Sequence, residues 1–575
     1  MFKNLFSKKN LPITIAVSVL LVIVIVLITV FSVLLGKSGG NNNSNDAGGN
    51  LSSANSSGGS GSSNSSSGNS SSNPNYTNQN YTPTNPGNWA KVEYKAMPTL
   101  DNVTLTKSEV ISKYRGYTDW RIYSIRTAKD EIKPAEGCTA YYVSNRGSTK
   151  NDGLSPETPL ATINNLEKIK LKLKAGDVIY FERGSVFRGQ LLADVAGVTY
   201  AAYGEGKKPE IYASPRNAAE KDDWVQTKEN KNVYKYCFNL SNDVGTLVFN
   251  GGEKHAIKCI IRTENDGTTY NNTTGDRFNT FADLNQNLHF YHDYKESGAL
   301  YLYCEDGNPG EVFDSIEMCI KSNVIAVKAD NVRIDNICVK YGGAHGIGAG
   351  TRNGLKVTNC EFGWIGGSIQ GENLYGRNYP VRYGNGVEIY GGCDDFEVSN
   401  CYFYQIYDAA ATFQYSKTGD SQIVMKNVNF SNNVMEYCNY SIEYFLSGGT
   451  PETSYMQDIY FTNNLMWYAG YGLCEQRPNK NADAHIKAWE HTNSLKGEFK
   501  INNNLFAFAK AYLVQSNAVV GANSPTYSGN TYIQFSSGYL GLSGNVQERV
   551  AFNSKVRDSI KSMLKDNKSK IIFVK

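Results

Sequence analysis

The sequence predicts an all-β fold: a parallel β-helix solenoid with a β-rich insertion, preceded by a single transmembrane helix and a disordered linker. Three observations support the solenoid. A short strand that ends in asparagine recurs six times in the second half of the chain, at intervals of 23, 41, 32, 31 and 40 residues. Each recurrence is followed by a second short apolar pair and a tyrosine- or glycine-rich run. No helical pattern separates these strands, so each unit can bury its apolar face only by stacking on its neighbours. The recurring asparagines are Asn336, Asn359, Asn400, Asn432, Asn463 and Asn503.

Composition narrows the classes of function. The formal net charge is +3, from 57 basic and 54 acidic residues, so no basic excess indicates a nucleic-acid partner. The 11 cysteines are odd in number and include no CxxC pair, so neither a zinc ribbon nor a closed disulfide framework is predicted. Cys360 and Cys401 directly follow the recurring asparagine, where Asn433, Asn464 and Asn504 stand in later units. We therefore expect these two cysteines to be small buried side chains in a stack, and not metal ligands.

The N-terminal region, residues 1–37, is predicted to be a cytoplasmic tip followed by a membrane anchor. Residues 11–35 form an uncharged apolar run of 25 residues. As a helix this run is about 37 Å long, enough to cross a hydrocarbon core of about 30 Å. Lys3, Lys8 and Lys9 precede the run and only Lys37 closely follows it. This asymmetry places the N-terminus in the cytoplasm and the rest of a single-pass cell-membrane protein outside. A cleaved signal peptide is the alternative, which the length of the run and the lack of a cleavage site disfavour.

A linker follows the anchor. Residues 38–88 are rich in Ser, Gly and Asn and nearly free of charged and bulky side chains, so they cannot bury a core. A flexible chain of about 50 residues spans roughly 40 Å on average. We expect it to tether an extracellular module to the cell surface.

Globular sequence begins at about residue 89. Residues 89–216 are predicted to hold the N-terminal part and the start of the solenoid. They include a weak helix signal at 107–114, a strand from Tyr141, a turn at Asp152-Gly153, a short helix over 163–173, and strands at 176–181 and 189–192. Residues 217–322 read as a separate β-rich insertion, 323–542 as the repeats, and 543–575 as a C-terminal helical cap with an amphipathic helix near 550–564.

The opening of this region resembles the start of extracellular right-handed parallel β-helix proteins with the pectin-lyase-like fold. The resemblance covers roughly residues 138–515 and implies that the helix at 163–173 caps the open end of the coil. The insertion is similar to the sandwich-like insertion of β-helical β-xylosidases. Because this fold hosts hydrolases, lyases, epimerases and adhesins, the resemblance implies a carbohydrate-active protein without fixing the reaction.

Aligning the units on their asparagines predicts a second strand about ten residues later, with one column of side chains inward and the next outward. The predicted inward column is Ile347, Val387, Ala410, Ile442, Leu473 and Leu513. The predicted outward column is Gly348, Glu388, Ala411, Glu443, Cys474 and Val514. Two positions before the inward column stand His345, Asn385, Asp408, Tyr440, Tyr471 and Ala511. The alignment thus brings three carboxylates, Glu388, Asp408 and Glu443, to one face on successive coils.

These carboxylates are the catalytic candidates, as acid, base or nucleophile with roles unassigned. Stacked strands lie about 4.8 Å apart, so Glu388 and Glu443, two coils apart, should be roughly 10 Å apart at Cβ. The carboxyl groups of Glu388 and Glu443 could reach the separation of about 6.5–9.5 Å that an inverting glycosidase needs. The carboxyl groups of Glu388 and Asp408, on adjacent coils, could reach the separation of about 5–5.5 Å that a retaining glycosidase needs. Close carboxylates also split their pKa values, which leaves one protonated and one ionised. The alternative is that these are ordinary surface charges.

The substrate-binding candidates lie in the loop 366–383 and in the polar column. Tyr375, Arg377 and Arg382 in the loop could stack on sugars or pair with a uronate or sulfate, although an ordinary solvated loop is an equal alternative. His345, Tyr440 and Tyr471 are the candidates in the column. For His345 a structural role is the stronger interpretation.

The sequence favours a cell-surface glycoside hydrolase whose partner is a polysaccharide or oligosaccharide. One alternative is a polysaccharide lyase, possibly dependent on calcium held by carboxylates such as Glu361 and Asp394-Asp395. No outward ladder of carboxylates is dense enough to predict a metal site, and no other cofactor is expected. The second alternative is a non-catalytic adhesin that binds glycans and leaves them intact.

Overall fold

A computed structural model describes residues 91–372, 374, 379–416, 422–447, 452–478, 483–488, 495–516, 525–543 and 548–575. The predicted anchor at 11–35, the predicted linker at 38–88, and the loop residues Tyr375 and Arg377 lie outside these ranges. No helix in the described part of the chain is long and apolar enough to cross a membrane.

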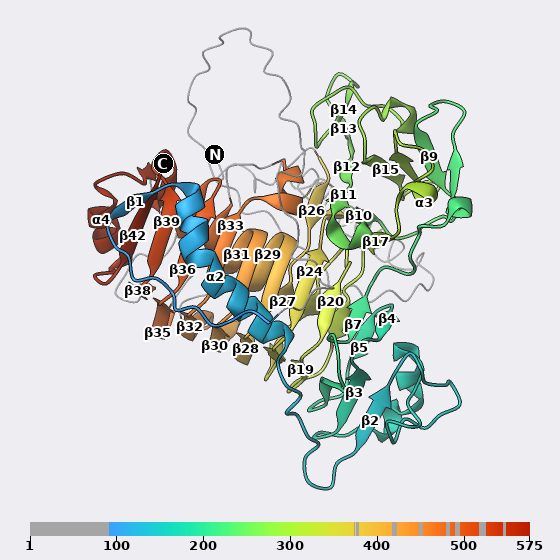
Figure 1. The fold of residues 1–575 in the computed structure, drawn as a ribbon, viewed down its shortest axis with the longest axis horizontal. Helices are drawn as coiled ribbons and strands as arrows, with labels where there is room; N and C mark the ends of the chain where they lie inside the picture. Colours follow the sequence, from blue (N-terminus) through green and yellow to red (C-terminus); the bar gives the residue numbers. More distant parts are fainter. Residues whose placement is uncertain are drawn as a thin grey trace, which may run out of the picture. The chain divides into compact units, whose positions relative to one another are not determined.

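The chain winds into a parallel β-helix with three sheets, and strands from successive coils pair in parallel (Figure 1). The long strands β29 and β31 bend through two of the sheets. The helix-covered sheet contains β4 (Val186–Arg188), β7 (Glu210–Tyr212), β20 (Cys338–Lys340), β24 (Glu361–Ile365), the first halves of β29 (Tyr402–Ser416) and β31 (Val434–Ser447), β33 (Leu465–Ala469), β36 (Leu505–Ala509), β39 (Thr531–Phe535), β42 (Lys570–Val574) and β1 (Val103–Leu105).

The two remaining sheets are named the site sheet and the third sheet. The site sheet contains β5 (Leu191–Ala193), β18 (Ile325–Val327), β21 (Ile347–Ala349), β27 (Val387–Tyr390), the second halves of β29 and β31, β34 (Ala484–Ala488), β37 (Tyr512–Ser516) and β40 (Tyr539–Ser543). The third sheet contains β2 (Ala140–Val143), β3 (Val178–Glu182), β6 (Thr199–Tyr203), β19 (Arg333–Asp335), β23 (Lys356–Thr358), β28 (Cys393–Ser399), β30 (Val424–Ser431), β32 (Tyr455–Thr462), β35 (Leu495–Asn502) and β38 (Thr526–Ser528).

The six recurring asparagines form the corner between the third sheet and the helix-covered sheet. All six have positive φ, between 52° and 62°. This left-handed conformation is unfavourable for most residues, and asparagine is among the few side chains that tolerate it. The recurrence in the sequence is therefore the signature of one sharp turn repeated once per coil.

The residues that directly follow the corner asparagines are buried, and hydrogen bonds join them from one coil to the next. Nδ2 of Asn433 donates to Oδ1 of Asn464 at 3.0 Å, and Nδ2 of Asn464 donates to Oδ1 of Asn504 at 3.0 Å. Cys401 and Cys360 continue the same row; the backbone N–H of Cys401 donates to Asn433 at 2.9 Å and that of Cys360 to the Cys401 sulfur at 3.4 Å. Both cysteines are free and fully buried. The prediction of a buried stack is confirmed.

Helix α2 (Lys107–Arg126) covers the helix-covered sheet and is longer than the predicted 107–114. Thr106 and Glu109 form a capping box at its start. Arg126 pairs with the buried Glu361 at 2.8 Å, and Trp467 donates to Thr118 at 3.0 Å. Just before α2, strand β1 pairs in parallel with β42, so the N-terminal segment reaches the C-terminal coil and then runs back across the sheet (Figure 1).

An insertion leaves the coil between β7 and β18. Its larger sheet has the order β12 (Ile257–Cys259), β15 (His289–Asp293), β16 (Ala299–Tyr303), β9 (Val233–Tyr236) and β8 (Trp224–Gln226). Its smaller sheet has the order β11 (Lys254–His255), β10 (Val244–Phe249) and β17 (Ile316–Ile320). A hairpin of β13 (Ile261–Thr263) and β14 (Thr269–Asn271) completes it.

The two ends of the coil differ from the expectation of simple helical caps. At the N-terminal end two 3₁₀ turns, Ile163–Lys168 and Lys170–Lys172, replace the expected helix and bury Ile163 and Leu166 in the core. At the C-terminal end the helical part is α4 (Val556–Ser559) and a turn of π-helix (Ile560–Leu564). The chain then ends in β42, a strand of the helix-covered sheet, whose consecutive apolar residues pair with β39 and complete the last coil.

Candidate active site

The site sheet carries an outward row of polar and charged side chains, one from each coil. Pairwise strand register gives this row as Gly348, Glu388, Thr412, Glu443, Lys487 and Gln515. The adjacent inward row is Ile347, Val387, Ala411, Ile442, Ile486 and Val514. Glu388 and Glu443 share the outward row, as predicted. The predicted members Ala411, Cys474 and Val514 are wrong, and so are the inward members Ala410, Leu473 and Leu513.

A β-bulge explains the first error. Ile406 pairs with Cys438 and Ala409 pairs with Tyr440, so Tyr407 and Asp408 together face the single residue Asn439. One extra residue shifts every later position of β29 by one and turns the bulged side chains away from the regular rows. Ala409 therefore takes the position predicted for Asp408 beside Tyr440, and Asp408 lies in the bulge, outside the regular rows.

Three donors orient the carboxylate of Glu388, which is 8% exposed. Oε2 accepts from Nδ2 of Asn385 at 2.5 Å and from Nε2 of Gln414 at 2.7 Å. Oε1 lies 3.4 Å from Nε2 of His345. Nδ1 of His345 accepts the backbone N–H of Asn385 at 3.1 Å, so the ring proton is on Nε2 and points to Glu388. His345 thus contacts a catalytic candidate and holds its orientation.

Asp408 pairs with Arg477, a residue that the sequence reasoning missed. Oδ1 of Asp408 lies 3.0 Å from a terminal nitrogen of Arg477, whose guanidinium also lies over the rings of Tyr407 and Tyr440, at 5.2 and 5.8 Å. Burial raises the pKa of the Asp408 carboxyl; Arg477 opposes this shift and the negative charge of Glu388 adds to it. The two carboxylates therefore interact electrostatically, and Asp408 is the one biased toward its protonated form.

Glu443 is followed in the outward row by Lys487, which is 1% exposed. Burial lowers the pKa of Lys487 to about 7, although the charge of Glu443 opposes the shift. The ammonium group also lies 5.9 Å from the ring centre of Tyr440. Between Glu388 and Glu443 lies Thr412, whose buried hydroxyl has no hydrogen-bond partner among the described residues. A buried hydroxyl in that state is normally satisfied by water or a ligand.

The second error in the predicted rows has a different cause. After β33 the chain leaves the coil as η8 (Gly472–Gln476), a 3₁₀ turn that contacts β29 and β31, and it re-enters at β34. Ala484 therefore takes the position predicted for Tyr471. Tyr471 lies just before η8, with the Lys510 ammonium 4.8 Å from its ring centre. Tyr440 lies two positions before the inward row, as predicted. No pattern in the sequence marks where such an excursion ends, so Arg477 and Lys487 could not be placed.

In the described part of the predicted loop 366–383, strands β25 (Ser368–Gly371) and β26 (Val381–Tyr383) pair in antiparallel. Arg382 in β26 is buried and donates to the carbonyl oxygens of Gly367 at 2.6 Å and Gly245 at 3.0 Å. It also bonds Gln476 at 3.2 Å. These contacts give Arg382 a structural role and argue against its predicted contact with substrate, because its donors face protein groups.

Gln476 connects the site to the insertion. Its Oε1 accepts the backbone N–H of Lys258 at 3.1 Å in β12, and its Nε2 donates to the carbonyl of Ala256 at 3.0 Å. It is 2% exposed and directly precedes Arg477. The insertion, the hairpin and η8 therefore meet at one buried amide next to the Arg477–Asp408 pair.

The carboxylates considered for calcium are engaged by cations. Burial opposes ionisation of Glu361, but Arg126 lowers its pKa to about 2. Asp394 lies 3.0 Å from Lys426, and Asp395 lies 3.1 Å from Lys356. Among the described residues, no group of three or more His, Cys, Asp or Glu side chains is arranged to hold a metal ion.

No protein-family profile and no curated protein matches the sequence. Among solved structures, the chain is similar to XylC, determined with xylose, at 12% identity over 70% of this chain and 69% of that one, with a TM-score of 0.39. It is similar to a GH136 lacto-N-biosidase from Eubacterium ramulus at 12% identity over 81% and 72%, with a TM-score of 0.36. It is also similar to the pectate lyase Pel9A at 11% identity over 73% of each chain, with a TM-score of 0.28. At these identities and TM-scores the likeness carries no argument about function, and the predicted parallel β-helix is confirmed by the strand pairing itself.

Proposed function

We propose that the protein is a cell-surface glycoside hydrolase, built on a right-handed β-helix, that cleaves a polysaccharide or oligosaccharide with Glu388, Asp408 and Glu443. One observation carries the proposal: Glu388 and Glu443 stand two coils apart in one outward row, with the unpartnered hydroxyl of Thr412 between them in the described structure. At about 4.8 Å per strand, this spacing suits two carboxyl groups on either side of a water and a glycosidic bond.

The environments suggest a division of roles. Asp408 is the proposed acid because burial and the charge of Glu388 raise its pKa, so it can hold a proton for the leaving oxygen. Glu388 and Glu443 flank the position at Thr412 where the attacking water would lie. Arg477, beside Asp408, and Tyr440 would contact the sugar.

Single replacements test the hydrolase. Glu388→Gln, Asp408→Asn and Glu443→Gln are assayed in the full-length protein against a panel of plant, host and bacterial glycans, together with wild type. We expect at least one substrate of the wild type for which two of the three variants lose about 10³-fold or more in kcat, while thermal unfolding remains cooperative. Full activity in all three variants on such a substrate would overturn the site.

A polysaccharide lyase is the second candidate because of Lys487. With a pKa of about 7, its amine is partly neutral at neutral pH and could remove the proton beside a uronate carboxylate. The C–O bond to the neighbouring sugar then breaks, the leaving oxygen takes the electron pair and a proton from water, and a C=C bond forms, while Arg477 neutralises the carboxylate. Only this reaction gives an unsaturated product that absorbs in the ultraviolet, and Lys487→Met should abolish it. Binding without either product would indicate an adhesin.

The cell-surface location rests on the apolar run 11–35 and the linker 38–88. Protease treatment of intact cells that express the full chain tests it. Release of the folded C-terminal part from intact cells, with the N-terminal peptide left in the membrane fraction, is the expected result. Protection of the whole chain until lysis would contradict it.

A further inference from the structure

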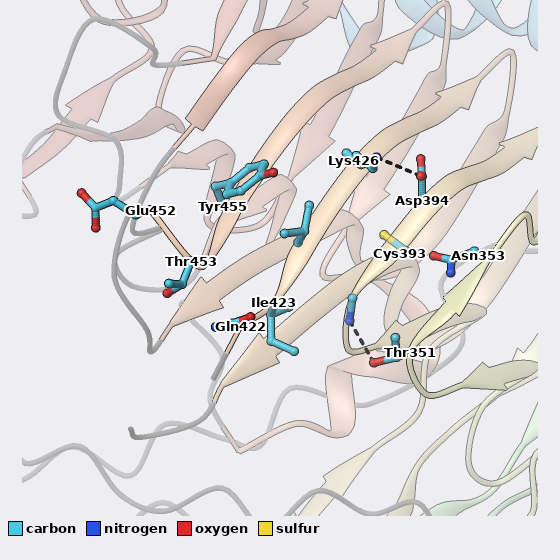
Figure 2. A pocket seen from close by; sticks show the side chains of 12 residues that line it. Thr351, Asn353, Cys393, Asp394, Gln422, Ile423, Lys426, Glu452, Thr453 and Tyr455 are labelled. Atoms are coloured by element: carbon cyan, nitrogen blue, oxygen red, sulfur yellow. Dashed lines mark hydrogen bonds and ion pairs between the residues drawn. The ribbon is translucent and has the colours of Figure 1, made fainter. Parts of the chain in front are cut away.

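A hollow of about 560 Å³ lies at the start of strands β28, β30 and β32 of the third sheet (Figure 2). Its floor is made by the first outward positions of β28, β30 and β32. Val424 pairs with Tyr455 in one row, and Asp394 pairs with Lys426 in the next. The volume is in the range of small-molecule binding sites.

Gly392 lines the hollow through its backbone. Gly392 precedes β28, and its N–H donates to Oγ1 of Thr351 at 3.1 Å. A Cβ at this position would lie 3.1 Å from the carbonyl oxygen of Val424 and 3.6 Å from Cγ2 of Thr351. Its neighbour Gly391 has a φ of +147° and needs glycine for its backbone, whereas Gly392 is not among the residues with positive φ. Glycine at 392 therefore allows the close approach of Val424 and is not required by a positive φ.

The lining combines hydrogen-bonding groups with apolar surface. Figure 2 shows the ion pair of Asp394 and Lys426, in which Nζ lies 3.0 Å from Oδ2 and the two charges oppose each other. The Lys496 ammonium lies 3.6 Å from the centre of the Tyr455 ring. The amides of Asn353 and Gln422 and the hydroxyl of Thr351 supply donors and acceptors, beside the apolar Ile423 and Val424. The carboxylate of Glu452 also belongs to the lining, so the hollow has no excess of positive charge. Such a set of donors and acceptors next to apolar groups suits the hydroxyls and the C–H face of an uncharged sugar better than it suits an anion.

The hollow and the row of carboxylates lie on consecutive segments of the same coils. Glu388 and Gly392 are four residues apart, a path of at most about 13 Å in extended chain. A glycan that is bound at the carboxylates and continues past the ends of β27, β29 and β31 would therefore reach Gly392.

We propose that this hollow is a second binding site, for an uncharged sugar unit of the glycan that the carboxylates cleave. The choice of ligand rests on the proposed function, but the site is defined by its own residues. It would strengthen the binding of long chains by engaging them at two places, with little effect on short ones.

Calorimetric titration of the full-length Glu388→Gln protein tests the site with three probes: xylohexaose, cellohexaose and galactohexaose. The further variants are Asn353→Ala and Tyr455→Ala in the hollow. Asn429→Ala is the matched control, because Asn429 lies on β30 of the third sheet but does not line the hollow. We expect at least one probe to bind about tenfold more weakly in each hollow variant and unchanged in the control. Thermal unfolding of each variant verifies its fold.

Equal affinity in the hollow variants and the control, or binding of none of the probes at millimolar concentration, would overturn the inference. Because binding is measured without turnover, the two proposals can fail separately. Binding that depends on the hollow in a protein whose wild type cleaves no glycan would refute the hydrolase alone. Cleavage with binding indifferent to Asn353 and Tyr455 would refute the second site alone.

Discussion

Nε2 of His345 lies 3.4 Å from Oε1 of Glu388, and the backbone N–H of Asn385 fixes the ring by donating to Nδ1. The imidazole therefore offers its one N–H to the carboxylate. We expect His345→Ala to lower kcat/KM by about 10²-fold, because a small misplacement of a catalytic carboxylate has an effect of that size. Steady-state kinetics on the substrate found for the wild type measures it.

His345→Gln is the matched control, since its amide can donate toward Glu388 without the contact to Asn385. Partial recovery relative to His345→Ala would support a positioning role. Equal activity of all three proteins would show that the orientation of Glu388 does not depend on this ring.

The pH profile reports on Asp408. Arg477 opposes the rise in the pKa of Asp408 that burial and Glu388 cause, so Arg477→Gln should raise this pKa further. If Asp408 is the acid, activity falls as pH rises through its pKa, and the basic limb of the kcat/KM profile should move to higher pH in Arg477→Gln. Arg477→Lys keeps the charge and should leave the limb nearer its wild-type position. A shift confined to the acidic limb would instead make Asp408 a base.

Glu443 could be placed because its coil has no irregularity between Asn432 and the strand, and Glu388 could be placed because the alignment sets the loop 366–383 aside as an insertion. Counting failed in β29, where the bulge at Tyr407 and Asp408 adds one residue. It failed again after β33, where η8 takes the chain out of the coil. A bulge changes the register by one residue without altering the apolar pattern enough to be recognised.

Contacts between distant segments were also beyond the reach of the sequence. Arg477, which pairs with Asp408, directly follows Gln476, and Gln476 is bonded to Lys258 and Ala256 of the insertion, more than 200 positions earlier. The strand β1 joins β42 at the opposite end of the chain. Periodicity predicts the coil itself, since each repeat contacts its neighbours, but not which loops meet above it.

Lys487 should make stability depend on pH. Its pKa is about 7 when folded against an ordinary value of 10.5, so between these values the unfolded chain binds more protons. The free energy of unfolding should therefore rise with pH above about 7 and be lowest below it. The free energy of unfolding of Lys487→Met should exceed that of wild type by more at pH 6 than at pH 9, as measured by urea unfolding. A difference independent of pH, like that expected for the exposed control Lys113→Met, would contradict a buried amine.

Neighbouring asparagines at one corner should respond differently to replacement. Oδ1 of Asn464 accepts from the backbone N–H and Nδ2 of Asn433, both at 3.0 Å, and its Nδ2 donates to the carbonyl of Phe430 at 2.9 Å. Asn464→Ala leaves these buried groups unsatisfied and should lower the free energy of unfolding by about 3 kcal/mol. Asn463 has a φ of 58°, so Asn463→Gly should change it by less than about 1 kcal/mol. Urea unfolding with unchanged m compares the two variants. Equal losses in the free energy of unfolding would refute the distinction between the buried asparagine row and the corner asparagines.

Gln476 should act on the reaction through Arg477. Gln476→Leu keeps the volume but removes the bonds to Lys258, Ala256 and Arg382, so η8 should hold Arg477 less firmly against Asp408. We expect kcat/KM to fall by about 10²-fold. We also expect the basic limb of the pH profile to move upward, in the same direction as in Arg477→Gln. Replacement of the exposed Gln226 in the insertion by Leu is the control, and it should leave kcat/KM and the basic limb of the pH profile unchanged. If Gln476→Leu lowers stability and leaves the basic limb of the pH profile in place, Gln476 supports the fold alone. If the basic limb moves while stability is unchanged, the insertion contributes to setting the protonation of Asp408.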